Sequence, residues 1–260
     1  MAGLLVLPAL LGLAVAASAA SSAATTAQET EAQRWVQLAS DGLDPRALAA
    51  LGQIHGAGRQ LLALRGYLRT GDTLAARWSW SAEQIAAYPD SEEGRATATA
   101  LDAVAQSFAA ANPGYTLSAN REPRSLAAQI AAWNGNASVT RAADLLLESL
   151  RQQAQGKADA ARLRTLLMNW PLPTPVTLAA PGLSAHGQGR AYDFRVSKDG
   201  LLIAGPEAAT ARQRWDAAGW TDRLRAAIKD SGQPFSGPLQ APYEPWHYSW
   251  SPAAHPATRP

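Results

Sequence analysis

Residues 184–193 read Ser-Ala-His-Gly-Gln-Gly-Arg-Ala-Tyr-Asp, and the end of this stretch decides the expected fold. Small or polar residues alternate with large apolar ones over residues 189–196, which is the period of a β-strand. Residues 199–200 are Asp-Gly, a hairpin turn signal, so residues 201–204 are expected to return as a second strand. Helical patterns surround this hairpin. We therefore expect an α+β fold with a small antiparallel sheet packed with helices.

The same stretch places two potential metal ligands, His186 and Asp193, seven residues apart. In one uninterrupted strand this odd spacing would send their side chains to opposite faces. Gly187 and Gly189 allow the chain to turn between them. Beyond the turn, Asp193 shares a face with small residues, while the face that begins with Tyr192 is expected to pack on the core.

A second short stretch, Glu244-Pro245-Trp246-His247, is expected to form a β-turn with proline at its second position. Such a turn brings its ends within about 7 Å, so a carboxylate would lie beside the imidazole. Together the two stretches offer two imidazoles and two carboxylates in a chain with 4 histidines and no cysteine. A catalytic zinc site needs three protein ligands and a separate base. From the residues alone, a metal site and a pair of structural histidines both remain open.

The combined pattern Ser-x-His-x-x-Gly-x-Ala-x-Asp and Glu-x-Trp-His resembles the zinc D-alanyl-D-alanine carboxypeptidases of the VanY type, in the peptidase M15 family. That group shares its metal fold with the hedgehog proteins. The resemblance covers residues 113–250. It implies that His186, Asp193 and His247 bind one Zn²⁺ ion and that Glu244 is the catalytic base.

The resemblance also implies a substrate site, in which Ser184 helps to hold the terminal carboxylate and Trp246 contacts the substrate. The family's upstream motif, Ser-Gly-Tyr-Arg-Ser-x-x-x-Gln, supplies a further arginine. Here Arg124 and Gln129 fall in register, but the Gly-Tyr pair is replaced by Glu-Pro. Arg121, three residues earlier, competes with Arg124 for the arginine's role.

The expected function is therefore hydrolysis of a D-amino-acid bond in peptidoglycan stem peptides. The expected enzyme is a D-alanyl-D-alanine or L,D-carboxypeptidase. Two alternatives stay open. One is an endopeptidase of the same family, and the other is a wall-binding or regulatory module that keeps the metal site with little turnover.

The distribution of charge along the chain restricts the class of partner that we expect. Residues 1–120 carry 7 Arg against 10 Asp and Glu, whereas the rest of the chain carries 16 Lys and Arg against 11 Asp and Glu. A mildly basic second half suits a carboxylate-bearing partner. Nucleic acid is excluded as an expected partner, because no basic run is interleaved with aromatic residues.

Residues 1–27 resemble a signal peptide, or an N-terminal hydrophobic segment, because an apolar run is followed by small residues. We expect export to the periplasm or cell envelope, with no stable membrane span once this segment is removed. The absence of cysteine is compatible with export.

Four further segments are expected from the sequence. They are a helical region at 28–112, a peptidase core at 113–252, a helical insertion within it at about 135–175, and a tail at 253–260. A helix start is expected at Asp44-Pro45, and another at Ser138. The Trp78-Ser79-Trp80 stretch could mark a docking face, but packing in the core is the favoured interpretation.

Overall fold

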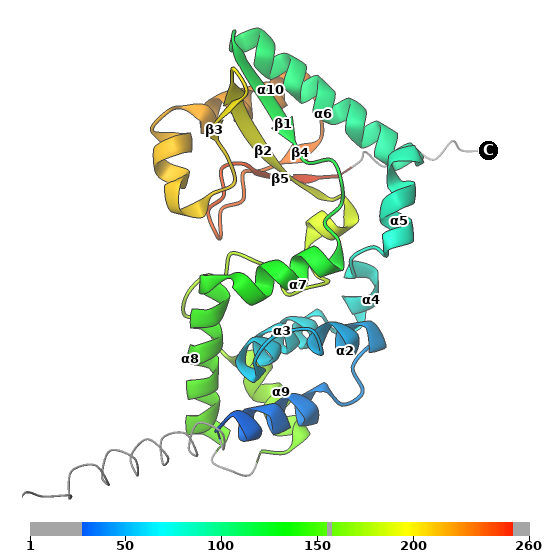
Figure 1. Cartoon of the computed structure of the whole chain (residues 1–260), viewed down its shortest axis with the longest axis vertical. Coiled ribbons are helices and arrows are strands. Elements are labelled where there is room, and N and C mark those ends of the chain that lie inside the picture. Colours follow the sequence, from blue (N-terminus) through cyan, green and yellow to red (C-terminus); the bar gives the residue numbers. More distant parts are fainter. Residues whose placement is uncertain (1–27, 155–157, 252–260) are drawn as a thin grey trace, which may run out of the picture. The chain divides into compact units, whose positions relative to one another are not determined.

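The computed structural model describes residues 28–154 and 158–251 (Figure 1). The expected signal segment and the expected tail lie outside these residues. Within them, no helix is long and apolar enough to cross a membrane.

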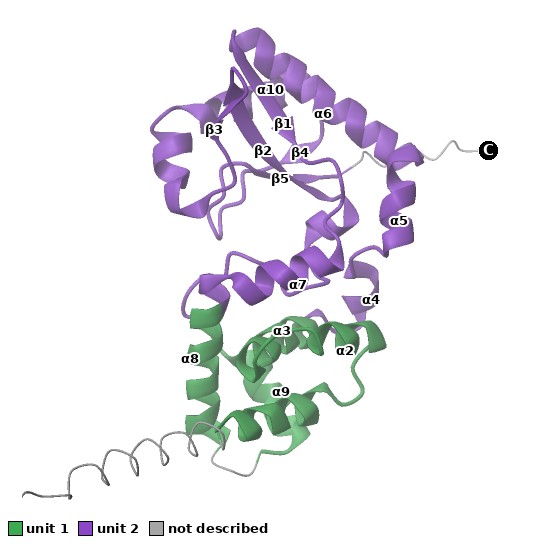
Figure 2. Ribbon diagram, in the orientation of Figure 1, with its two compact units in different colours: residues 1–69, 140–171 green, residues 70–139, 172–260 purple. Residues whose placement is uncertain are grey.

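The chain forms two compact units, each built from two separate stretches (Figure 2). The helical unit contains residues 28–69 and 140–171, and the sheet unit contains residues 70–139 and 172–251. The units do not follow the expected boundary at residue 112. The helix that precedes this boundary belongs to the sheet unit, and most of the expected insertion belongs to the helical unit.

In the described part of the helical unit, a helix over residues 28–40 is followed by four more. These are α2 (Pro45–Leu51), α3 (Ala57–Thr70), α8 (Ala137–Ala154) and α9 (Ala160–Asn169). Asp44 caps α2 as expected, because its side chain accepts a hydrogen bond from the backbone N–H of Arg46. Gly58 lets α3 approach α8 closely, since a Cβ there would lie 2.8 Å from Leu147.

The start of α8 differs from the expectation at Ser138. Its cap is Asn136, whose Oδ1 accepts hydrogen bonds from the backbone N–H groups of Ser138 and Val139. An amide oxygen two residues earlier reaches both free N–H groups, so the serine is not needed as the cap.

The sheet unit is built on a small antiparallel sheet, which confirms the α+β class. Its strands are β1 (Tyr115–Ala119), β2 (Ala191–Lys198), β3 (Leu201–Ala204), β4 (Phe235–Ser236) and β5 (His247–Trp250). The long strand β2 organises the sheet. It pairs with β5 over residues 191–193, with β1 over residues 194–198, and with β3 through the expected Asp199-Gly200 turn.

The apolar face of β2 lies in the core of the sheet unit, as its alternation predicts. Tyr192, Phe194 and Val196 are each at most 2% exposed. They share this core with residues of α6 (Glu92–Ala111) and α10 (Trp220–Ser231), and α6 packs against both β1 and α10. The opposite face of β2 is left free to carry the site.

Short helices complete the sheet unit. They are η1 (Gly71–Thr73), α4 (Leu74–Arg77), α5 (Ala82–Ala87), η2 (Tyr88–Asp90), α7 (Leu126–Gly135), η3 (Ala185–Gln188), η4 (Ala208–Thr210) and the π-helix η5 (Arg212–Asp216). Residues 206–219 do not form one continuous helix, because η4 and η5 divide this segment. The indole of Trp215 is fully buried and donates a hydrogen bond to the Gly205 carbonyl, which anchors this irregular segment.

Candidate metal centre

His186 lies on η3, the short turn that precedes β2. The chain leaves this turn at Gly189, whose φ of 61° is the left-handed conformation that glycine adopts without strain. Gly187 is needed for a different reason: a Cβ there would lie 2.1 Å from Ser79 Oγ. The expected break between the two candidate ligands is therefore confirmed, and it turns His186 back toward β2.

Asp193 and His247 are brought together by strand pairing. They are direct partners in the antiparallel ladder between β2 and β5, so their side chains leave the same face of the sheet. His247 Nδ1 lies 3.0 Å from Asp193 Oδ1.

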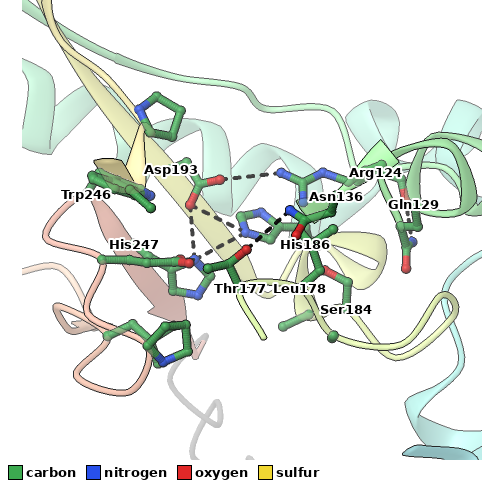
Figure 3. A pocket seen from close by; sticks show the side chains of 18 of the residues that line it. Arg124, Gln129, Asn136, Thr177, Leu178, Ser184, His186, Asp193, Trp246 and His247 are labelled. Carbon is green, nitrogen blue, oxygen red and sulfur yellow. Dashed lines mark hydrogen bonds and ion pairs between the residues drawn. The ribbon is translucent and has the colours of Figure 1, made fainter. Parts of the chain in front are cut away.

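His186 completes a group of three. Its Nε2 lies 3.3 Å from His247 Nδ1 and 3.5 Å from Asp193 Oδ1, and the two imidazole rings meet edge to face (Figure 3). All three side chains are less than one-fifth exposed. His186, Asp193 and His247 thus form a group that could hold a metal ion.

The electrostatics of this group favour a cation. Burial lowers the pKa of His186 to about 4, so its imidazole is neutral at pH 7. Burial raises the pKa of Asp193, but the hydrogen bond from His247 and the electrostatic influence of His186, His247 and Arg124 outweigh it, so this pKa lies below its ordinary value. The two facing ring nitrogens can share at most one proton. At least one lone pair therefore faces an ionised carboxylate, and a bound cation would relieve that repulsion.

Glu244 lies beside this group at the start of the expected turn. The N–H of His247 donates to the Glu244 carbonyl across 3.1 Å, which confirms a β-turn over these four residues. The Glu244 carboxylate lies 3.5 Å from His247 Nδ1, and its side chain is 13% exposed. Burial raises the pKa of Glu244 above its ordinary value, although the neighbouring charge of His247 opposes the shift.

The two candidate arginines have different positions. Arg124 lines the cavity above the group, and its Nη2 lies 3.4 Å from Asp193 Oδ2 (Figure 3). Its backbone N–H donates to the His186 carbonyl across 2.9 Å. Arg121 is exposed, pairs with Asp102 and does not line the cavity. Of the two, Arg124 is the arginine that the structure brings to the site.

Gln129, expected to bind substrate, is a buried part of the wall. Its Nε2 donates to Ser79 Oγ and to the Arg124 carbonyl, at 2.8 and 2.9 Å, and its Oε1 accepts from the Gly182 N–H. With its amide bonded on both sides to protein, it supports the loop of Arg124. Trp78 and Ser79 are buried, which confirms packing at this stretch.

A cavity of about 800 Å³ opens over the three-residue group. Ser184 and Trp246 both line it, but Trp246 is only 3% exposed and its ring lies 6.1 Å from that of Trp215 between centroids. Pro242, Glu207 and Arg195 form other parts of the wall.

One part of the wall was not predicted from the sequence. Asn136 Nδ2 donates to Thr177 Oγ1 across 3.3 Å (Figure 3). Ser138 Oγ lies 3.2 Å from the same hydroxyl. These contacts fasten residues 176–179 along the cavity. The proline-rich composition of this stretch gave no sign that it lines a site.

Comparisons with protein-family models, with curated proteins and with solved structures find no match for this chain.

Proposed function

We propose that this chain is an exported zinc peptidase that hydrolyses a D-amino-acid bond of peptidoglycan stem peptides, acting as a carboxypeptidase. The observation that carries the proposal is the position of Glu244. It lies against the group formed by His186, Asp193 and His247, yet it stands outside the three atoms that converge. Three ligands with a separate buried carboxylate are what metal-assisted hydrolysis requires. The resemblance to VanY-type enzymes supports the same assignment.

The donor set fits zinc. Two imidazole nitrogens and one carboxylate oxygen are ligands that zinc accepts, and tetrahedral coordination at about 2.0–2.1 Å places ligand atoms about 3.3 Å apart. The three separations here are 3.0, 3.3 and 3.5 Å. When bound, the zinc ion would supply Lewis acidity, lowering the pKa of a water and polarising the scissile carbonyl.

The chain's own residues account for proton movement and positioning. Glu244, with its raised pKa, accepts a proton from the attacking water and returns it to the leaving amine. Arg124 retains guanidinium N–H groups beyond the one that faces Asp193, and these stabilise negative charge on the carbonyl oxygen. Ser184, on the cavity wall, hydrogen-bonds the terminal carboxylate.

The test is to incubate the zinc-loaded protein with a stem pentapeptide ending in D-Ala-D-Ala and to follow the products by mass spectrometry. Release of free D-alanine by the wild type, and its loss in Glu244→Gln at unchanged zinc content, are expected. If the protein cleaves an internal bond of the peptide instead, it is an endopeptidase and not a carboxypeptidase. If the zinc-loaded protein cleaves no muropeptide, the enzyme hypothesis is refuted, and the wall-binding or regulatory module is the remaining hypothesis.

A further inference from the structure

A second arginine lies on the same face of β2 as Asp193. Side chains alternate along a strand, so Asp193 and Arg195 project from one face. Both residues line the cavity, and Arg195 is exposed to solvent there. Two residues of strand separate their Cα atoms by about 6.8 Å. Arg195 is thus held within a side chain's reach of the candidate metal centre.

Within residues 28–154 and 158–251, the Arg195 side chain has no protein partner, unlike the other charged residues of the cavity. Arg124 pairs with Asp193, and Glu244 lies against His247. The carboxylate of Glu207 accepts a hydrogen bond from Thr210. Among the residues that the structure describes, no carboxylate forms an ion pair with Arg195, including Glu207 on the neighbouring wall. A planar guanidinium with free donors, facing a cavity, is well suited to bind a carboxylate.

We propose that Arg195 is a specificity-determining residue that binds a free carboxylate on the acyl side of the scissile bond. The inference rests on the proposed function and adds to it the charge of the substrate. The side of the scissile bond that faces Arg195 follows from the direction of β2. The Ala185 carbonyl accepts from the Arg190 N–H, which places Ser184 and its neighbours at the start of β2. Arg195 lies beyond Asp193, toward the opposite end.

A substrate that spans the centre would therefore have its leaving residue at Ser184 and its acyl residues near Arg195. In a stem peptide, the second residue and a diamino-diacid third residue each carry a carboxylate that can be free or amidated. Both sources present the same chemistry to a guanidinium. We therefore use three pentapeptides ending in D-Ala-D-Ala: one with both groups free, one amidated at the second residue, and one amidated at the third.

The experiment measures kcat/KM of the zinc-loaded protein for each peptide. We expect wild type to lose about tenfold in kcat/KM, mainly through KM, when one of the two carboxylates is amidated. The peptide whose amidation lowers kcat/KM shows whether Arg195 binds the carboxylate of the second or of the third residue. Arg195→Gln should cleave the three peptides equally, and Arg195→Lys should retain part of the preference. Arg121→Gln removes the same charge from the same unit outside the cavity, and it should behave as wild type.

Equal kcat/KM of wild type for all three peptides, or an unchanged preference in Arg195→Gln, would overturn the inference. Calorimetric binding of the three peptides to the metal-free protein separates this outcome from failure of the proposed function. If wild type cleaves nothing, tighter binding of a free-carboxylate peptide that is lost in Arg195→Gln still supports a carboxylate site at Arg195. Identical binding of all three peptides would reject it.

Discussion

Asp193 and His247 face each other directly across the ladder between β2 and β5, with 3.0 Å between their nearest side-chain atoms. A shift of one residue in this register would send the imidazole to the opposite face of the sheet. The pairing of β5 with β2 is therefore part of the candidate metal centre, because backbone hydrogen bonds of this ladder position both Asp193 and His247.

Removing one imidazole should remove the metal. His247→Ala leaves two of the three converging atoms, and we expect the affinity for zinc to fall about tenfold or more, since even outer partners of a ligand are worth 10–100-fold. Zinc content after dialysis against a weak chelator, measured by mass spectrometry of the metal, gives the result. His55→Ala, in the helical unit, is the matched control. Undiminished zinc in His247→Ala would exclude this residue as a ligand.

Glu244→Gln should stabilise the metal-free protein at neutral pH. The folded-state pKa of Glu244 is raised by burial, so folding favours its protonated form. The stability that this group contributes is present below its ordinary pKa of 4.5 and is lost as the pH rises through the raised value. At pH 7 the wild type carries that cost and the glutamine does not.

Denaturant unfolding of both metal-free proteins at pH 7 and at pH 4 measures this effect. The advantage of Glu244→Gln should be clear at pH 7 and should shrink at pH 4. A variant that is less stable than wild type by the same amount at both pH values would show that burial of the charge is not the cause.

Gly187→Ala should disturb the floor of the site. The added Cβ would lie 2.1 Å from Ser79 Oγ and 2.7 Å from Gln129 Nε2, both in buried side chains. Overpacking of this kind costs about 1–3 kcal/mol. Thermal unfolding should show a lowered Tm for this variant, whereas Gly135→Ala, with no atom within 4 Å of the new Cβ, should stay close to wild type.

A second substitution tests whether the contact with Ser79 causes the loss of stability in Gly187→Ala. Adding Ser79→Gly to Gly187→Ala removes the closest contact, so it should recover part of the lost Tm. If the double variant is no more stable than Gly187→Ala, the contact with Ser79 does not explain the glycine.

Asn136 should have two separable roles. Asn136→Ala removes the cap of α8 and the contact with Thr177, and loss of the cap costs about 1 kcal/mol. Asn136→Asp keeps the acceptor oxygen but loses the N–H donor to Thr177. We expect the aspartate variant to keep most of the stability while residues 171–184 become more sensitive to limited proteolysis. Equal destabilisation by both substitutions would contradict a capping role.

Local rules were enough to predict the geometry of the two short stretches. Strand parity and two glycines predicted the break between His186 and Asp193, and Pro245 predicted the turn that holds Glu244 near His247. These features depend on residues that are close in sequence, so backbone preferences determine them. The α+β class followed from the same alternation.

The surroundings of the site could not be predicted in this way. Ser79 contacts Gln129 across 50 residues, and Asn136 contacts Thr177 across 41 residues. No local period signals such pairs. For the same reason the sequence did not decide between Arg121 and Arg124. That choice depends on the hydrogen bond from the Arg124 backbone N–H to the His186 carbonyl, which joins residues far apart in the chain. Arg195 could have been found by extending the parity argument two residues beyond Asp193.

The buried pair of Ser79 and Gln129 has a practical consequence for isolating the part of the chain that carries the candidate site. A fragment that begins at residue 113 would contain every residue of the motifs, yet it would leave Gln129 and Gly182 without Ser79 and would expose the wall that Trp78 covers. The compact unit that contains the candidate site starts at residue 70, so a fragment made from this unit would need residues 139 and 172 joined by a designed linker.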